Sequence, residues 1–508
     1  MNDVRDGSHA SSSKGSGSDR LCRQHPKVAG TLPPTGPERV LQVGEGNFLR
    51  GFADWMLNRL VRSGRWTGSV VMTPARPPGG PRLEALTRQD GLYTVWTRGL
   101  ERSAAVDRTE VVSVIGRVLD PFRDWLGYLA LAESSSLAIV ISNTTERGIF
   151  YDPAVDRTRP ETLNYPARLT ELLHRRFRFA DADPAAGLVM MPCELVENNG
   201  ALLRSMVLQY ANAWGLGSAF GHWVEEHNSF VDTLVDRIVP GRPPEAADTV
   251  ANWGYADDFA VVAEPYRLWA ISDDERTMAR LPFDRLATED DDEGDQDVGL
   301  GAFFTSRVDW YRERKLRVLN GTHTFLAPLG LLLEMGTVRE VVTHERWGGV
   351  VRGFLHEVVL PAVGGPAGLG QYADQVWDRF RNPFVDHRLS DITLNALGKF
   401  RIRLAPLWRR LPREATRARQ ALAWSLASQI WLYSAANPGK VEDAPEVIER
   451  VQNHLASEAR GEGLTAVLAD PELWGEEGRV ESDLVGAVQA YWEAIRRGRA
   501  DAIARLLA

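Results

Sequence analysis

The fold is decided by Arg39-Val40-Leu41-Gln42-Val43-Gly44-Glu45-Gly46-Asn47, in which a short apolar run meets a glycine turn. An apolar run of this length, bounded by glycine, predicts a buried strand. The next apolar residues recur at helical spacing and predict a helix: Phe48, Phe52, Trp55, Met56 and Leu60. Residues 69–72 predict a second strand. Strand, glycine turn, helix and strand in this order indicate the start of a nucleotide-binding α/β fold.

The alternation continues through the first half of the chain. Residues 137–142 and 188–192 are predicted to be buried parallel strands, and polar residues follow each of them. Open α/β sheets bind ligands outside the carboxyl ends of their strands. Three strands therefore deliver polar residues to one predicted crevice.

The remaining organisation follows from composition. Residues 1–36 are predicted to form a disordered tail, because the serine- and glycine-rich stretch 11–18 has nothing to bury. The run 289–297 holds seven carboxylates in nine residues and predicts a solvated surface loop. Beyond about residue 301 the apolar spacing becomes mostly helical. We therefore expect a nucleotide-binding domain over 37–300 and a helical domain over 301–508.

Composition also excludes several classes of protein. The chain of 508 residues is 44% hydrophobic and 25% charged, as in an ordinary globular protein. Its formal net charge of −9 argues against nucleic-acid binding. Cys22 and Cys193 are its only cysteines, so we expect neither a disulfide framework nor a metal cluster. No run of 18 or more apolar residues and no secretory signal is found, so we expect a cytoplasmic protein without a membrane span.

Lysine is rare in this chain. Only five of the 59 basic residues are lysine, and two of these, Lys315 and Lys399, stand in regions predicted to be ordered. Arginine cannot lose its proton in a protein, whereas lysine can. A lysine retained among so many arginines is therefore a candidate acid–base group.

The first candidate catalytic set is Lys315, Asn320 and His323. On an α-helix of 100° per residue, these three side chains fall within one arc of about 140°. A buried lysine with a lowered pKa can exchange a proton with an alcohol, and Asn320 and His323 can donate hydrogen bonds to its oxygen. The alternative interpretation is a packed helix face without chemistry.

The glycine turn is the candidate cofactor site. Gly44 and Gly46 let backbone N–H groups approach a pyrophosphate, although Leu49 replaces the third glycine of the usual fingerprint. The second strand ends in Thr73-Pro74-Ala75-Arg76, without the acidic residue that would bind a ribose hydroxyl. Arg76 suits a 2′-phosphate, so these residues leave the choice between NAD and NADP open.

A third group lies around Arg379-Phe380-Arg381-Asn382-Pro383, followed by His387 and Lys399. Two arginines at such a turn suit a bidentate grip on a carboxylate, and an ion-paired helix end is the alternative. The arginine-rich stretch 401–419 is interleaved with leucine and tryptophan, which favours a helix face or a subunit contact over nucleic-acid binding.

Taken together, several stretches resemble the polyol-specific long-chain dehydrogenases, the mannitol dehydrogenase family. The stretches that carry the resemblance are 41–50, 89–94, 142–146, 192–195, 233–239, 313–323 and 379–383. The resemblance implies a Rossmann-like N-terminal domain, a mainly α-helical C-terminal domain and an active site between them. It implies Lys315 as the catalytic acid–base residue, with Asn320 and His323 beside it.

The resemblance also implies binding residues for NAD, with NADP not excluded. Those expected at the dinucleotide are Val43, Gly44, Gly46, Asn47 and Phe48, with Thr145 and Glu146 at the nicotinamide end. Those expected at the substrate are Asp236, Arg237, Arg381, His387 and Lys399.

One departure from the family bears on the substrate. Mannitol dehydrogenases carry a Cys-Asp-Asn run whose asparagine helps to hold the substrate oxygen, and this chain has Cys193-Glu194-Leu195 instead. The branch of the family that acts on sugar acids looks similar to this chain at that run, so the resemblance favours that branch. Leucine cannot bind the oxygen, which leaves Asn320 and His323 to hold it. The expected activity is the NAD-dependent reduction of a keto sugar acid. Another sugar acid, a polyol such as mannitol or arabinitol, and a non-catalytic nucleotide sensor are the alternatives, and the oligomeric state is open.

Overall fold

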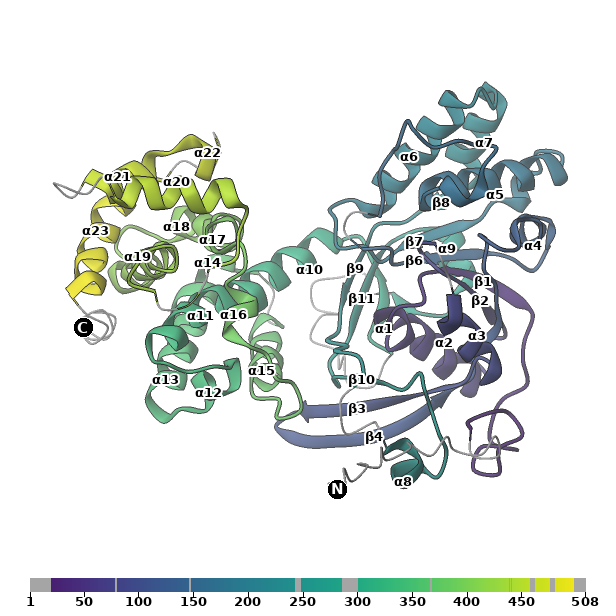
Figure 1. Ribbon diagram of the computed structural model, residues 1–508, viewed down its shortest axis with the longest axis horizontal. Coiled ribbons are helices and arrows are strands. Elements are labelled where there is room, and N and C mark those ends of the chain that lie inside the picture. Colours follow the sequence, from purple (N-terminus) through teal and green to yellow (C-terminus); the bar gives the residue numbers. More distant parts are fainter. Residues whose placement is uncertain are drawn as a thin grey trace, which may run out of the picture. The chain divides into compact units, whose positions relative to one another are not determined.

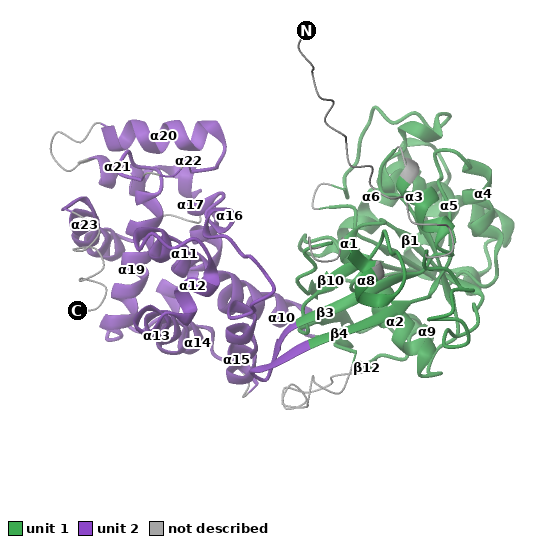
Figure 2. Ribbon diagram, turned by 60° about the horizontal axis from the view of Figure 1, so that its bottom comes forward, with its two compact units in different colours: residues 1–98, 107–285, 297–306 green, residues 99–106, 286–296, 307–508 purple. Residues whose placement is uncertain are grey.

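The computed structural model describes residues 20–77, 80–145, 148–242, 248–285, 300–365, 368–437, 439, 441–456, 462–475 and 480–497. The chain divides into two compact units (Figure 2). Unit 1 comprises residues 1–98, 107–285 and 297–306, and unit 2 comprises residues 99–106, 286–296 and 307–508.

Unit 1 is built on a six-stranded sheet (Figure 1). Its strands are β1 (Glu38–Val43), β2 (Ser69–Thr73), β5 (Ile115–Val118), β6 (Ile139–Ser142), β7 (Val189–Pro192) and β8 (Ser229–Phe230). All are parallel, in the order β5-β2-β1-β6-β7-β8. Numbered along the chain, this is the 3-2-1-4-5-6 order of a Rossmann fold. The predicted fold class is confirmed for this half of the chain.

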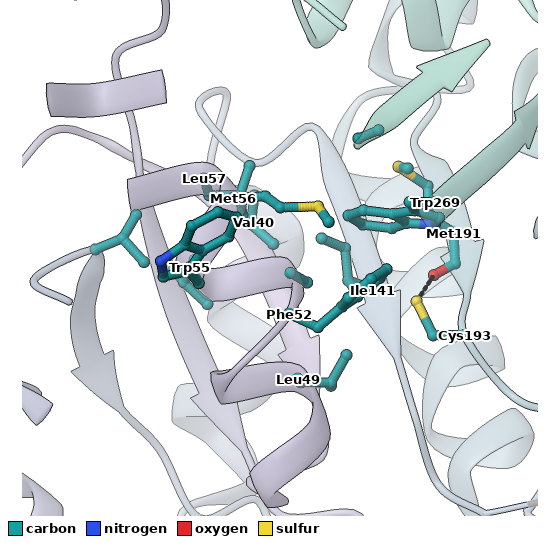
Figure 3. Packing of buried hydrophobic residues seen from close by; sticks show 14 of the residues in the cluster. Val40, Leu49, Phe52, Trp55, Met56, Leu57, Ile141, Met191, Cys193 and Trp269 are labelled. Atoms are coloured by element: carbon teal, nitrogen blue, oxygen red, sulfur yellow. Dashed lines mark hydrogen bonds between the residues drawn. The ribbon is translucent and has the colours of Figure 1, made fainter. Parts of the chain in front are cut away.

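The two faces of the sheet bury two separate cores, as the alternation of side chains along a strand requires. Leu41 and Val43 pack under the helices α5 (Tyr165–Phe179), α6 (Asn199–Ala213) and α7 (Ser218–His227), which lie over one face in Figure 1. Val40 faces the opposite core, where Phe52 and Trp55 pack with Trp269 (Figure 3).

A second sheet closes the core around Val40. It has the order β12-β13-β11-β9 and is formed by β9 (Thr233–Asp236), β11 (Leu268–Ser272), β12 (Asp284–Arg285) and β13 (Ala302–Thr305). A third sheet has the order β10-β3-β4 and is formed by β3 (Tyr93–Glu101), β4 (Ala104–Val112) and β10 (Val261–Ala263). The remaining α-helices of unit 1 are α1 (Asn47–Arg50), α2 (Ala53–Arg62), α3 (Gly80–Arg88), α4 (Trp125–Ala130), α8 (Thr249–Trp253) and α9 (Glu275–Arg280).

The helix predicted after the glycine turn is interrupted. It forms α1 and α2, which are separated by Gly51 and Phe52. A Cβ atom at position 51 would lie 2.8 Å from Val239 Cγ1, so glycine permits the close packing at this break. The free carbonyl of Gly51 accepts a hydrogen bond of 2.6 Å from Arg237 Nη1. The break is therefore a supported feature of the fold.

Residues 20–36 differ from the predicted disordered tail. The Leu21 N–H donates to Ala256 O at 2.9 Å, and Leu21 and Val28 are buried against Leu92 and Tyr255. Apolar side chains within this short segment therefore tie it to unit 1, which the serine- and glycine-rich composition of residues 11–18 concealed. Residues 1–19 and the acidic run 289–297 lie outside the described residues.

Unit 2 is helical over most of its described residues, as predicted. Its first helices are α10 (Val308–Arg314), the π-helix η6 (Lys315–Gly321), α11 (Thr322–Leu332), α12 (Val338–Thr343), α13 (Glu345–Gly353), the π-helix η7 (Phe354–Val359), α14 (Leu360–Val363) and α15 (Leu369–Phe380). They are followed by α16 (Leu389–Ile392), α17 (Ala396–Arg403), α18 (Ala405–Arg410), α19 (Thr416–Trp431), α20 (Pro445–Ala456), α21 (Glu462–Ala469), α22 (Pro471–Trp474) and α23 (Ser482–Arg497). Among the described residues of the chain, none of these helices or those of unit 1 is long and apolar enough to cross a membrane.

The segment from Lys315 to Gly321 is a π-helix, which corrects the α-helical geometry assumed from the sequence. A π-helix closes its hydrogen bonds between residues i and i+5, and such turns are frequent at functional sites. Residues five apart are therefore neighbours along its surface. This places Lys315 and Asn320 one turn apart on the same side of the segment.

Pro328 lies inside α11, where it removes the N–H that would bond to the carbonyl of Thr324. The buried Gln429 of α19 replaces that donor, because its Nε2 atom donates to Thr324 O at 2.5 Å. A glutamine from a second helix therefore satisfies the backbone of the helix that carries His323.

We predict that Gln429→Leu lowers the free energy of unfolding by about 1–3 kcal/mol, because it leaves a buried carbonyl without a partner. Pro328→Ala supplies the missing backbone donor, so the double variant should recover most of the loss. Thermal or urea unfolding of the two single variants and the double variant measures this. A double variant whose loss equals the sum of the two single losses would contradict the explanation.

Candidate functional site

The predicted cofactor residues of unit 1 gather where the strand order of the main sheet reverses. Val43 pairs with Thr73 of β2 on one side and with Ser142 of β6 on the other. Gly44 follows with φ +124°, and a Cβ atom on it would lie 2.7 Å from Asn143 O. Only glycine fits there. The turns after β1 and β6 thus lie side by side at the position where such sheets bind ligands.

The rest of the glycine turn is open at one residue and packed at the next two. A Cβ atom at Gly46 would meet nothing within 4 Å. Asn47 Oδ1 accepts a hydrogen bond of 2.5 Å from Arg50 Nη2, and the ring of Phe48 stacks on Phe52 at 4.8 Å. Glu146, which the sequence assigned to the nicotinamide end, lies outside the described residues.

A carboxylate stands at the end of β2, although the sequence places none after that strand. Glu45, from within the glycine turn, reaches across so that its Oε2 atom accepts a hydrogen bond of 3.3 Å from Ala75 N. The buried Arg168 holds the same loop by donating to Ala75 O at 2.8 Å. Arg76 is exposed. Glu45 was not predicted from the sequence, because an acidic residue with this role is expected directly after the second strand rather than inside the glycine turn.

Asp236 and Arg237 lie at the end of β9, and both are buried. Arg237 donates through Nε to Glu264 O at 2.9 Å and through Nη1 to Gly51 O, and its guanidinium lies 4.5 Å from the ring of Trp55. Burial lowers the pKa of Arg237 to about 9. The contacts of Arg237 fix the junction of α1 and α2, and a substrate contact of these two residues stays a prediction.

In unit 2, Lys315 and Asn320 are half-buried on the π-helix η6, and His323 is buried in the first turn of α11. Asn320 O accepts hydrogen bonds from Thr324 Oγ1 at 2.9 Å and from Arg403 Nη1 at 3.4 Å. Arg317 Nη1 donates a hydrogen bond of 2.9 Å to Arg403 O. These hydrogen bonds hold the segment that carries the candidate catalytic residues against the end of α17.

His323 is the centre of a cluster of basic groups. Its side chain is 7% exposed, and its ring lies 4.7 Å from that of His387 and 4.5 Å from that of Phe380. Its Nε2 atom is buried and has no hydrogen-bond partner among the described residues. A buried donor or acceptor without a partner is costly, so a hydrogen bond from a bound ligand or a water molecule to Nε2 would be favourable.

Burial and positive neighbours hold the two histidines neutral. Burial lowers the pKa of His323 well below its ordinary value, and His387, Arg403, Arg379 and Lys399 lower it further. Burial also lowers the pKa of His387, against the opposing effect of Asp391. The predicted residues His323, His387 and Lys399 are therefore brought together.

Lys399 is also shifted by its surroundings. Burial, followed by the charge of Arg403, lowers the pKa of Lys399 to about 8, and its Nζ atom donates to Ile392 O at 2.9 Å. Asp443 opposes this shift. The result is a cation that is easily neutralised.

The two arginines of the 379–383 turn have different surroundings. Arg379 is buried and contributes to the positive potential at His323 and His387. Arg381 is partly exposed and pairs with Asp378 at 3.9 Å. Asp378 in turn accepts a hydrogen bond of 2.7 Å from Ser103 N. Arg379 and Arg403 thus join the cluster. The sequence suggested Arg379 for a carboxylate, whereas Arg403 was given no substrate-binding role.

The described residues contain no group of three or more His, Cys, Asp or Glu side chains that could hold a metal ion. Both cysteines are free thiols, and Cys193 is buried.

Comparison with known proteins places the chain in a family. The model of the mannitol dehydrogenase Rossmann domain matches residues 38–285, and the model of the mannitol dehydrogenase C-terminal domain matches residues 307–496. The chain belongs to the mannitol dehydrogenase family. It is accordingly an oxidoreductase that acts on CH–OH groups.

Relatives in this family are similar over most of their length. An altronate oxidoreductase of Bacillus subtilis (strain 168) is 37% identical over 461 residues, covering 90% of this chain and 92% of the relative. An altronate oxidoreductase of Halalkalibacterium halodurans is 40% identical over 419 residues, covering 82% of this chain and 78% of the relative.

Two solved structures share the fold of this chain. A substrate-free D-sorbitol dehydrogenase matches with a TM-score of 0.73 at 21% identity, covering 95% of this chain and 100% of that one. Pseudomonas fluorescens mannitol 2-dehydrogenase, solved with NAD and D-mannitol, matches with a TM-score of 0.69 at 21% identity, covering 96% and 99%.

The lowered pKa of Lys399 predicts how stability depends on pH. Below about pH 8 the folded protein bears the cost of holding this ammonium group partly buried. Between about pH 8 and the ordinary lysine pKa of 10.5, the folded state has lost the proton while the unfolded chain keeps it. The contribution of Lys399 to stability therefore becomes more favourable as the pH rises through this window.

We expect the melting temperature of the wild type, relative to that of Lys399→Met, to rise between pH 7.5 and pH 10. The comparison is made by thermal unfolding in matched buffers. A difference that stays constant across this range would show that Lys399 keeps its ordinary pKa in the folded protein.

Proposed function

We propose that this protein is an NAD-dependent tagaturonate reductase that interconverts D-tagaturonate and D-altronate by hydride transfer. Similarity to altronate oxidoreductases over most of the chain supports a sugar-acid substrate. The observation that carries the proposal is the buried Nε2 atom of His323, which has no partner among the described residues and is surrounded by cationic groups. A sugar acid supplies both an oxygen for that nitrogen and a negative charge for those cations.

Lys315 has the role of acid–base residue in this proposal. Reduction of a ketone produces an alkoxide, which must take up a proton, and oxidation of the alcohol must release one. The amine of Lys315 exchanges this proton with the substrate oxygen. Asn320, five residues along the π-helix, donates a hydrogen bond to the same oxygen and stabilises its developing charge.

The histidines and the remaining cations orient the substrate. Because His323 is held neutral, one ring nitrogen donates and the other accepts, so it can bind a substrate oxygen without competing for the proton of Lys315. Lys399, Arg379 and Arg403 supply the positive potential that favours a carboxylate at the far end of the substrate. His387 orients the ring of His323 by contact with it.

The turns of unit 1 fit a dinucleotide. Gly44 permits the close approach to Asn143, and the open surface of Gly46 lets a pyrophosphate reach the backbone. A nicotinamide cofactor, when bound, supplies or accepts the hydride. Val43, Asn47, Phe48, Thr145 and Glu146 are the other residues we assign to its binding.

Glu45 supports NAD over NADP. A carboxylate at the end of the second strand accepts hydrogen bonds from the hydroxyls of an adenosine ribose and repels a 2′-phosphate. Glu45 stands at this end of β2, whereas Arg76, the residue suited to a phosphate, is exposed. The negative charge of Glu45 at this end of β2 therefore favours NAD over NADP.

The substrate class is tested by initial rates with altronate, mannonate, mannitol and arabinitol, each with NAD and with NADP. We expect altronate with NAD to give the highest kcat/KM. Mannonate in first place would make the protein a fructuronate reductase, and mannitol or arabinitol in first place would make it a polyol 2-dehydrogenase. Nucleotide binding without turnover of any substrate would favour the non-catalytic sensor.

Both Lys315→Met and Lys315→Arg should lower kcat by about 10²–10⁴-fold, because neither replacement can exchange a proton near neutral pH. Circular dichroism and the melting temperature monitor folding. Lys27→Met, which replaces a described lysine of unit 1, is the matched control and should retain activity. Turnover by Lys315→Arg at the wild-type rate would remove Lys315 from the mechanism.

Glu45→Gln should raise the ratio of kcat/KM for NADPH to that for NADH by roughly tenfold, because it removes the charge that repels the 2′-phosphate. Arg76→Gln is the matched control, and it should leave the preference for NADH in place. A wild-type enzyme that prefers NADPH, or a ratio unchanged by Glu45→Gln, would contradict the assignment of Glu45.

A further inference from the structure

Glu194 is a buried carboxylate that the proposed chemistry does not use. It follows β7 at the same end of the sheet as the glycine turn, and its side chain is 2% exposed. A buried carboxylate requires compensation by hydrogen bonds or charge. The groups that provide this compensation identify what Glu194 holds.

Among the described residues, the Glu194 carboxylate accepts three hydrogen bonds, all from the end of β6 and the turn after it. Its Oε1 atom accepts hydrogen bonds from Thr144 N and Thr144 Oγ1, both at 2.9 Å. Its Oε2 atom accepts one from Ser142 Oγ at 3.0 Å. Beside it, Asn143 Nδ2 donates to Cys193 O at 2.8 Å. The segment 193–194 therefore clamps residues 142–144.

Thr145, the residue after this segment, has a strained backbone. Thr145 has φ +83°, a left-handed conformation that is unfavourable for a β-branched side chain. Strain of this kind persists only where the surroundings enforce it, and it concentrates at functional sites. A Cβ atom at Gly148 would lie 1.9 Å from Thr144 Oγ1, so the orientation of Thr144 toward Glu194 also depends on that glycine.

We propose that Glu194 is a positioning residue for the nucleotide, acting through Thr144 to hold Thr145 in its left-handed conformation. The inference rests on the proposed function in one respect, which is the assignment of Thr145 to the nicotinamide end of the site. Glu194 itself touches no cofactor in this proposal. Its carboxylate anchors the amide and hydroxyl of Thr144, and the exposed Thr145 then presents its backbone to the bound nucleotide.

Loss of the hydrogen bonds from Ser142 and Thr144 to Glu194 should affect nucleotide binding alone. Without these bonds, Thr145 relaxes toward a negative φ, and the turn beside Gly44 changes shape. Nucleotide binding should weaken. The residues proposed to bind the sugar acid, such as Lys315, His323 and Lys399, belong to unit 2 and are not held by Glu194. A general loss of stability would produce no such selectivity.

The test compares Glu194→Leu, Glu194→Gln and a matched control. Leucine removes every acceptor. Glutamine keeps the oxygen that faces Thr144, and its amide group can donate to Ser142 Oγ, because a hydroxyl both donates and accepts. The control is Asp274→Asn, since Asp274 holds the same donor set elsewhere in unit 1: Thr277 N at 2.8 Å, Thr277 Oγ1 at 2.7 Å and Ser229 Oγ at 3.0 Å.

The Kd for NADH is measured by fluorescence titration of each purified full-length protein. We expect it to rise by about tenfold or more in Glu194→Leu, and to stay within about threefold of the wild type in Glu194→Gln and in Asp274→Asn. The KM for the sugar acid at saturating NADH should stay close to the wild-type value. A wild-type Kd in Glu194→Leu, or an equal rise in Asp274→Asn, would overturn the proposal.

A second measurement separates this proposal from the proposed function. Amide hydrogen exchange of residues 142–145, without nucleotide, should be faster in Glu194→Leu than in the wild type and Asp274→Asn. Failure of the wild type to bind NADH would overturn the proposed function, and unchanged exchange would overturn the clamp. If Glu194→Leu does not fold, Glu194→Asp is measured instead, since its shorter side chain cannot reach both Ser142 and Thr144; wild-type binding and exchange by that variant would overturn the clamp.

Discussion

A buried imidazole among cations is the constraint on which the candidate site depends. His323 cannot carry a proton where burial and four basic neighbours all oppose it, so the ring remains neutral. Its Nε2 atom then faces an interior that offers no partner among the described residues. Such an arrangement is unfavourable for the protein alone and becomes favourable when an anionic, oxygen-rich ligand binds. The π-helix beside it brings Lys315 and Asn320 to the same stretch of chain.

The Rossmann unit follows a second constraint, which is the close approach of two turns at the reversal of strand order. Gly44 and Asn143 come together there, and the neighbouring carboxylates have separate tasks. Glu45 accepts a hydrogen bond from Ala75 N at the end of β2, and Glu194 accepts one from Thr144 N in the turn after β6.

Much of the fold could be predicted because its signals are local. The strands near residues 40, 70, 140 and 190 are apolar runs ended by glycine, proline or polar residues, and each is a parallel strand of the main sheet. The π-helical turn was not predictable, since its apolar spacing is compatible with an α-helix and its carbonyls are satisfied by distant residues such as Arg403. The packing of residues 20–36 depends on partners more than 60 residues away, which composition does not reveal.

The site was predictable in part for the same reason. Lys315, Asn320 and His323 are close in the sequence, so their spacing made them candidates and the family resemblance supplied their roles, which stay predictions. Arg379 and Arg403 act on His323 through space and from other helices. Arg379 stood out in the 379–383 turn, whereas nothing in its local sequence distinguishes Arg403 from the many other arginines of the chain. The sequence shows that positions 45 and 194 are glutamates, but it does not show which backbone N–H groups donate to their carboxylates.

The most direct test of the account is the titration of His323 by nitrogen-15 NMR, with histidine-labelled protein and His323→Gln to assign the resonance. The account predicts a ring that stays neutral as the pH falls through 6.5, and a shift of its Nε2 resonance when altronate is added. A ring that titrates near pH 6.5, or an Nε2 resonance that does not respond to altronate, would contradict it.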